Sequence, residues 1–173
     1  MGVKLKPDER AEFTNALQRR PHLASLIGLA IAEYANAEMI MAIVFATLLG
    51  VEITIGTSIL DAIFGKNQKR NHIMAVARAK IKDPDLLKRI DEAVARVSDL
   101  GPSRDNMAHG KWSTCDSERF KDKLLWQKTT WSAVHGYELY DEPGLAELVN
   151  RIIHHRNVLQ LLIIDIAKYI KAI

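Results

Sequence analysis

The sequence predicts an all-α protein, a bundle of helices with one small β-hairpin, and three observations indicate it. Apolar residues recur at helical spacing over most of the 173 residues. Aromatic residues make up only 6% of the chain, and few stretches show the alternating polarity of β-strands. A chain of this length can bury about two-thirds of its unfolded surface, so we expect one domain, residues 1–173, that needs neither disulfides nor structural metal.

Turn signals divide the first part of the chain. We expect a short polar helix over residues 8–19, within an N-terminal extension 1–21, and then a long helix over 22–49 that is apolar almost all round. A helix of that pattern is typical of the centre of a bundle or of an interface. After Gly50, the stretch 51–55 is a connection that an extended segment would fit.

A third helix is expected after this connection. Thr57 or Ser58 supplies a hydroxyl that suits the N-cap position. Apolar residues then follow the helical period from Ile59 to Ile81, and Gly65 marks a bend.

The rest of the chain is expected to form two helices with a hairpin between them. Pro84 suits the first turn of a fourth helix, which Gly101 and Pro102 then stop or kink. Residues 111–131 are rich in Trp and Thr with alternating polarity, and this pattern predicts a β-hairpin inserted before the last helix. An apolar stripe close to the 3.6-residue period predicts that last long helix over 142–173.

Composition indicates a cytoplasmic setting. The single Cys115 excludes an internal disulfide framework and favours a reducing compartment. The N-terminal residues 1–10 are polar and lack the apolar region of a secretory signal. The long apolar stretch 23–51 is interrupted by charged and polar residues, and its uninterrupted run, 39–49, is shorter than the roughly 20 residues that a bilayer requires. We therefore expect no membrane span.

The packing of a helical bundle does not by itself explain one short polar segment. Arg104, Asp105, Asn106 and His109 fall within six positions, after a Gly-Pro pair and before Gly110. The segment resembles the hallmark of the HEPN (higher eukaryotes and prokaryotes nucleotide-binding) domains, an Arg followed by four to six residues and a His near the end of a late helix. The resemblance implies a HEPN-like up-and-down bundle. Without it, Arg104 would pair locally and His109 would only interact favourably with the helix dipole.

The resemblance also implies a chemistry. Many HEPN domains are metal-independent ribonucleases in which the His moves the proton of the 2′-hydroxyl and the Arg stabilises charge on the phosphate. Here these roles fall to His109 and Arg104. Asp105 would hold the site by hydrogen bonding to His109 or to the motif of a partner chain, and Asn106 would support it. A neutral imidazole near its pKa suits proton transfer, and a guanidinium offers a planar fork to phosphate oxygens.

Helix geometry adds a constraint on this motif. Positions five apart on an α-helix diverge by about 140°, so Arg104 and His109 of one chain do not share a stripe. Either the helix unwinds before Gly110 or two chains meet. HEPN domains commonly dimerise with both motifs in a shared cleft, and the apolar helix over 22–49 independently favours a homodimer.

Two carboxylates interrupt the apolar stripes of the first long helix. Glu33 and Glu38 lie where apolar residues are expected, and a carboxylate there needs a cationic or donor partner. His155 and Arg156 fill a gap in the stripe of the last helix. We expect at least one of the two acids to reach Arg104, His109, His155 or Arg156; the pair is either structural or part of the site.

Other chemistries fit the residues poorly. No Glu is followed by His three residues later, as a di-metal bundle requires, so no metal and no cofactor are expected.

A basic stretch runs from Lys66 to Arg89. Its eight Lys or Arg and two Asp give it a formal charge of +6. That charge either follows an RNA backbone or is a solvated helix face. The residues proposed for RNA contact are Lys66, Lys69, Arg70 and Arg78.

The sequence thus favours a metal-independent ribonuclease with an RNA substrate, acting in a toxin or defence system in which an antitoxin protein is a second partner. The alternative is a non-catalytic HEPN-like module that binds a nucleotide, RNA or a protein, and a third is a purely structural helical dimer.

Overall fold

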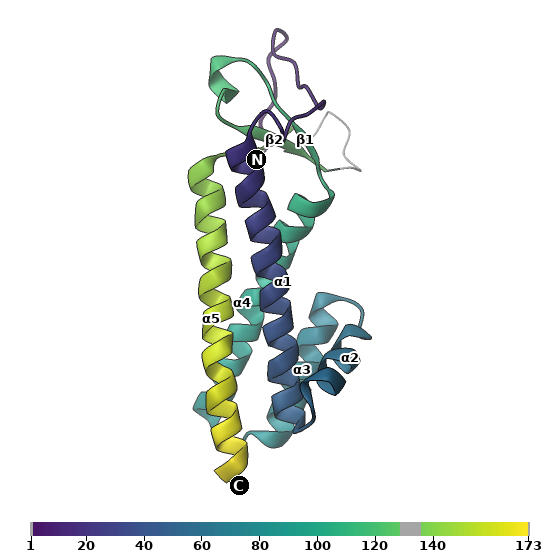
Figure 1. Cartoon of the computed structure of the whole chain (residues 1–173), viewed down its shortest axis with the longest axis vertical. Coiled ribbons are helices and arrows are strands. Elements are labelled where there is room, and N and C mark those ends of the chain that lie inside the picture. Colours follow the sequence, from purple (N-terminus) through teal and green to yellow (C-terminus); the bar gives the residue numbers. More distant parts are fainter. Residues whose placement is uncertain (1, 129–135, 173) are drawn as a thin grey trace. The chain divides into compact units, whose positions relative to one another are not determined.

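Helices make up most of the chain that a computed structural model describes, which comprises residues 2–128 and 136–172 (Figure 1). The described helices are α1 (Pro21–Leu49), α2 (Ile53–Asp61), α3 (Lys66–Lys80), α4 (Pro84–His109) and α5 (Glu142–Ala172). The described strands are β1 (Lys111–Ser113), β2 (Leu124–Gln127) and β3 (Glu138–Tyr140), and residues Glu118–Phe120 form one turn of 3₁₀ helix. The prediction of a mainly α-helical protein with a small β element is confirmed at this level.

The chain divides into two compact units. Unit 1 comprises Met1–Ala32 and Pro102–Asn150, and unit 2 comprises Glu33–Gly101 and Arg151–Ile173. Each boundary falls inside a helix, namely α1, α4 or α5. That the whole chain forms one domain stays a prediction.

The long helix predicted over 22–49 is confirmed as α1, and local signals set both of its ends. Pro21 occupies its first position, where a missing N–H costs nothing. Gly50 follows the last turn with φ 74°, a conformation that glycine adopts without strain. The N–H of Gly50 donates to the carbonyl of Thr47 at 3.2 Å and that of Val51 to the carbonyl of Ala46 at 3.2 Å. These bonds form a Schellman motif, which satisfies carbonyls that the helix itself leaves unpaired.

The prediction for residues 51–81 is wrong in two respects. The connection ends early because α2 already begins at Ile53, and Thr57 and Ser58 lie inside that helix and donate to backbone carbonyls of the preceding turn. Gly56 permits this path, since a Cβ there would lie 2.3 Å from the Cβ of Ala46 in α1. Figure 1 shows α2 beside the last part of α1. The helix also breaks rather than bends at Gly65, which has φ 89°.

Gly101 and Pro102 were predicted to stop or kink the fourth helix, and they do not stop it, because α4 continues through Pro102 to His109. A kink at this point stays a prediction. A proline inside a helix removes one backbone hydrogen bond. Hydrogen bonds from the sheet to the last carbonyls of α4, described below, stabilise the part of the helix that follows Pro102.

The helix predicted over 8–19 is also wrong. Residues 14–19 form turns, and Asn15 has φ 57°, which a helix does not contain. The segment pairs instead with the sheet region: Glu12 and Thr114 exchange two backbone hydrogen bonds of 2.8 and 2.9 Å, and Val3 pairs likewise with Tyr137. A local helix prediction cannot anticipate partners about a hundred residues away.

The predicted hairpin is confirmed where it is described, and the sheet gains a strand. The order is β1-β2-β3, all antiparallel, with Trp112 opposite Trp126 and Trp126 opposite Glu138. β3 was not predicted, and residues 129–131 of the predicted hairpin lie outside the described chain. Alternation along the strands gives the sheet two faces. Leu125 and Leu139 pack with Cys115 and Phe120 on one face, so the register places Trp112, Trp126 and Tyr140 on the other.

Unit 2 has its own core. It is built from fully buried aliphatic residues of α1 to α5 and the turn that follows α3: Leu48, Leu60, Ile73, Ile81, Ile90 and Leu159. The last helix predicted over 142–173 is confirmed as α5, whose inward stripe has the expected spacing.

A membrane test of the described helices singles out α1. An 18-residue window of α1 is apolar enough to cross a bilayer by length and composition, with a mean hydropathy of 1.5, and 44% of that window is buried inside the protein. Core helices of water-soluble proteins pass the same test, so the absence of a span stays a prediction.

Candidate functional site

The motif residues occupy the last turns of α4, in unit 1. Arg104 and Asn106 are half-buried, Asp105 and His109 are exposed, and Met107 is buried. The helix remains regular to its end, since the N–H of Gly110 donates to the carbonyl of Asn106 at 3.0 Å. The helix therefore does not unwind before Gly110, and Arg104 and His109 of one chain diverge by about 140° around its axis.

Asp105 lies next to both predicted catalytic residues. Its Oδ1 is 3.1 Å from Nη1 of Arg104, an ion pair. Asp105 and His109 are four residues apart, which places them on one exposed face of α4, about 40° apart. The carboxylate therefore holds the guanidinium of Arg104, one helical turn from His109. A hydrogen bond from Asp105 to His109 or to the motif of a partner chain, which the resemblance implies, stays a prediction.

The aromatic face of the sheet binds the end of α4. The Trp126 indole N–H donates to the carbonyl of Asn106 at 2.6 Å, and the Trp112 indole N–H donates to the carbonyl of Met107 at 3.3 Å. The last carbonyls of a helix have no partners within the helix. The two tryptophans supply such partners from outside and so fix the turn that carries His109.

Gly110 makes this contact geometrically possible. A Cβ at Gly110 would lie 1.4 Å from Nε1 of Trp126, far inside van der Waals contact. Trp126 is itself buried, with only 2% of its surface exposed. The glycine after the motif is therefore required by the tryptophan that crosses it.

Tyr140 completes the aromatic face. Its ring packs edge-on against Trp112 with centroids 5.1 Å apart, and its hydroxyl donates to Oε2 of Glu138 at 3.4 Å. Burial raises the pKa of Tyr140 to about 12, helped by the charge and hydrogen bond of Glu138 and opposed by a hydrogen bond with the Asn106 side chain. The tyrosine thus connects the motif's Asn106 to the sheet.

We expect Tyr140 to lose its proton about two pH units later than a free tyrosine, with a midpoint near pH 12. The folded-state pKa lies above the unfolded value of 10. The contribution of protonated Tyr140 to the free energy of unfolding is therefore intact below pH 10 and is lost as the pH rises toward 12. Tyrosinate absorbance measured against pH reports the step, and Tyr140→Phe should remove it. A Tyr140→Phe curve identical to that of the wild type would contradict the assignment.

The predicted pairing of a buried acid is confirmed in unit 2. Glu33 of α1 forms an ion pair with Nη1 of Arg156 of α5, and their side chains are only 16% and 24% exposed. Arg156 also donates to the Asn157 side chain at 2.9 Å. Glu38 is half-buried. A contact of either acid with the motif of α4 stays a prediction.

Replacing Arg156 with alanine should destabilise the protein by about 2 kcal/mol, less than for a fully buried pair because water still reaches both groups. The loss comes from the unpaired Glu33 carboxylate rather than from the pair's own attraction. The double variant Glu33→Leu/Arg156→Leu should therefore be more stable than Arg156→Ala in urea unfolding. A double variant less stable than the single one would contradict this account.

The basic stretch is partly neutralised inside unit 2. Nζ of Lys69 lies 3.5 Å from Oδ1 of Asp61, and Nη2 of Arg70 lies 2.8 Å from Oδ1 of Asp91. Arg78 is exposed on α3, and Lys66 is the first residue of that helix. Of the four residues predicted to contact RNA, two therefore already have carboxylate partners, which weakens the attraction of this face for phosphate.

Two further observations concern metals and thiols. Within residues 2–128 and 136–172, no group of three or more His, Cys, Asp or Glu side chains has a metal-binding arrangement. Cys115 is buried in the core beneath the sheet, next to Phe120.

Sequence reasoning missed the residues that hold the motif in place. Trp126 lies within the hairpin predicted over 111–131, and Tyr140 lies in no predicted element. No local pattern shows that either side chain contacts the fourth helix. His155 lies in a cavity of unit 2, described below. Comparison of the chain with protein-family models, curated proteins and solved structures found no match.

Proposed function

We propose that this protein is a metal-independent cytoplasmic endoribonuclease of HEPN type, with a HEPN-like bundle as its fold. The observation that carries the proposal is the end of α4, where Arg104, Asp105 and His109 stand in the spacing of the HEPN motif. Two tryptophans of the sheet donate hydrogen bonds to the last carbonyls of this helix. A toxin or defence system with an antitoxin is the context we propose, on the resemblance alone.

The residue types support an attack by the 2′-hydroxyl. His109 removes its proton, and the 2′-oxygen bonds to phosphorus as the bond from phosphorus to the 5′-oxygen breaks. The 5′-oxygen leaves with a proton from the imidazolium or from water. Arg104 stabilises the charge on the phosphate oxygens, and Asp105 keeps the guanidinium oriented. The products are a 2′,3′-cyclic phosphate and a 5′-hydroxyl.

The divergence of Arg104 and His109 on one helix favours a homodimer, in which the Arg of one chain and the His of the other face the same phosphate. We expect a two-fold dimer by light scattering at micromolar concentration. A monomer under these conditions would count heavily against the shared-cleft arrangement.

The test is cleavage of a mixed RNA pool by the purified full chain. We expect cyclic or 3′-phosphate ends, no cleavage of a 2′-deoxy substrate, and no effect of EDTA. Since contaminating ribonucleases leave the same ends, His109→Ala purified in the same way is the control. RNA binding without cleavage would reject the enzyme and favour a non-catalytic binding module.

A further inference from the structure

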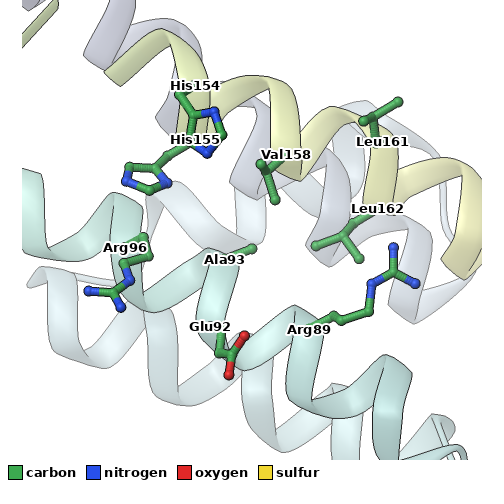
Figure 2. A pocket seen from close by; sticks show the side chains of 9 residues that line it. All are labelled: Arg89, Glu92, Ala93, Arg96, His154, His155, Val158, Leu161 and Leu162. Carbon is green, nitrogen blue, oxygen red and sulfur yellow. The ribbon is translucent and has the colours of Figure 1, made fainter. Parts of the chain in front are cut away.

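A cavity of about 280 Å³ lies between α4 and α5, wholly within unit 2 (Figure 2). One part of its wall is aliphatic, formed by Ala93 of α4 and by Val158, Leu161 and Leu162 of α5. Leu161 is 63% exposed although it is a large aliphatic residue, so this wall presents apolar surface to solvent. An occupant that covers it would gain free energy from apolar burial.

The two arginines that line the cavity lie at its two ends. Figure 2 shows Arg96 of α4 and His155 of α5 at one end and Arg89 of α4 at the other. Nη2 of Arg89 lies 2.6 Å from Oδ2 of Asp165, an ion pair. On the α4 side, Oε1 of Glu92 lies 3.9 Å from Nζ of Lys88. These two pairs leave the Arg89 end and the α4 side close to neutral.

The Arg96 end keeps its positive charge. Neither Arg96 nor Arg151 forms an ion pair within the described part of the chain. Desolvation lowers the pKa of His155, and the nearby His154, Arg151 and Arg96 lower it further, so cations from both helices converge on this ring. The guanidinium charges of Arg96 and Arg151 repel each other beside this partly desolvated ring. An anion bound there would relieve the repulsion and would be stabilised by both charges.

We propose that this cavity binds a small organic carboxylate, with the carboxylate at Arg96 and His155 and a short hydrocarbon or aromatic body against Val158 and Leu162. Of the two arginines that line the cavity, Arg89 is paired with Asp165 and Arg96 forms no ion pair within the described chain, so the site offers one guanidinium to a ligand. A single guanidinium fits a monoanion better than a doubly charged phosphate. The aliphatic wall offers no hydrogen-bonding group to a nucleobase or sugar. The volume of the cavity is just below the range of about 300–1,000 Å³ that is typical of ligand sites, so we expect a small ligand.

This site goes beyond the ribonuclease proposal, since none of its residues belongs to the motif of α4. The two proposals therefore fail separately: cleavage of RNA does not test the cavity, and carboxylate binding does not test the motif.

The experiment is calorimetric titration of the full chain with octanoate, octanol and acetate. We expect saturable binding of octanoate that is at least tenfold tighter than that of octanol, which lacks the charge, and of acetate, which lacks the body. Arg96→Gln should weaken octanoate binding at least tenfold. Arg78→Gln, which removes an exposed arginine on α3 outside the cavity, should leave it unchanged.

A second variant tests the apolar wall independently. Val158 is half-buried, so Val158→Phe should fill the cavity with the fold intact and abolish octanoate binding. Equal affinity for octanol and octanoate, or unchanged binding of octanoate by Arg96→Gln or Val158→Phe, would overturn the proposal.

Discussion

His109→Ala is expected to lower the rate of RNA cleavage at least about a hundredfold, the usual contribution of a positioned acid–base group. His109 is exposed at the last residue of α4, so the change removes no core packing. The melting temperature should stay within a few degrees of the wild type. His22→Ala, which removes another exposed histidine, from the first turn of α1, is the matched control and should cleave normally.

Arg104→Lys should fail in the same assay although it keeps the charge. A lysine ammonium lacks the planar fork that binds two phosphate oxygens, and it orients less firmly against Asp105. The decisive contrary result is cleavage by His109→Ala at the wild-type rate, which would end the ribonuclease assignment.

Gly110→Ala is expected to destabilise the protein by about 3 kcal/mol, the upper part of the usual range for overpacking. The added methyl cannot coexist with the buried Trp126 indole, whose Nε1 would lie 1.4 Å away. Relief requires the indole to move, which breaks its hydrogen bond to the carbonyl of Asn106. The last turn of α4 then loses an external partner, so RNA cleavage should fall as well.

Two controls separate the clash from a general effect of removing a glycine. Gly28→Ala lies in α1, where the new Cβ would meet nothing within 4 Å beyond its chain neighbours and its own helix backbone, and it should be neutral or stabilise by up to about 1 kcal/mol. In a Trp126→Leu background, Gly110→Ala should cost little, since the smaller side chain vacates the space. An equal cost in both backgrounds would show that the close approach is not the cause.

The candidate site was predictable only in part. The spacing of Arg104 and His109 and the need of Glu33 for a cation both follow from residue types at known positions on helices. The cavity between α4 and α5 was not predictable, because Arg96 and His155 lie 59 positions apart and only packing brings them to one space.

For the fold, the sequence by itself determined the long helices, since their signals are local. Pro21 and Gly50 bound α1, and a stripe of period 3.6 marks α5, because each helical hydrogen bond joins residues four apart. Only the tertiary structure decided the paths of the irregular segments. Glu12 pairs with Thr114 rather than within a helix. α4 continues past Pro102, and the indole N–H groups of Trp112 and Trp126 donate to its last carbonyls. The reason is physical: those hydrogen bonds join residues distant in the chain, and no local pattern encodes a partner that folding alone brings near.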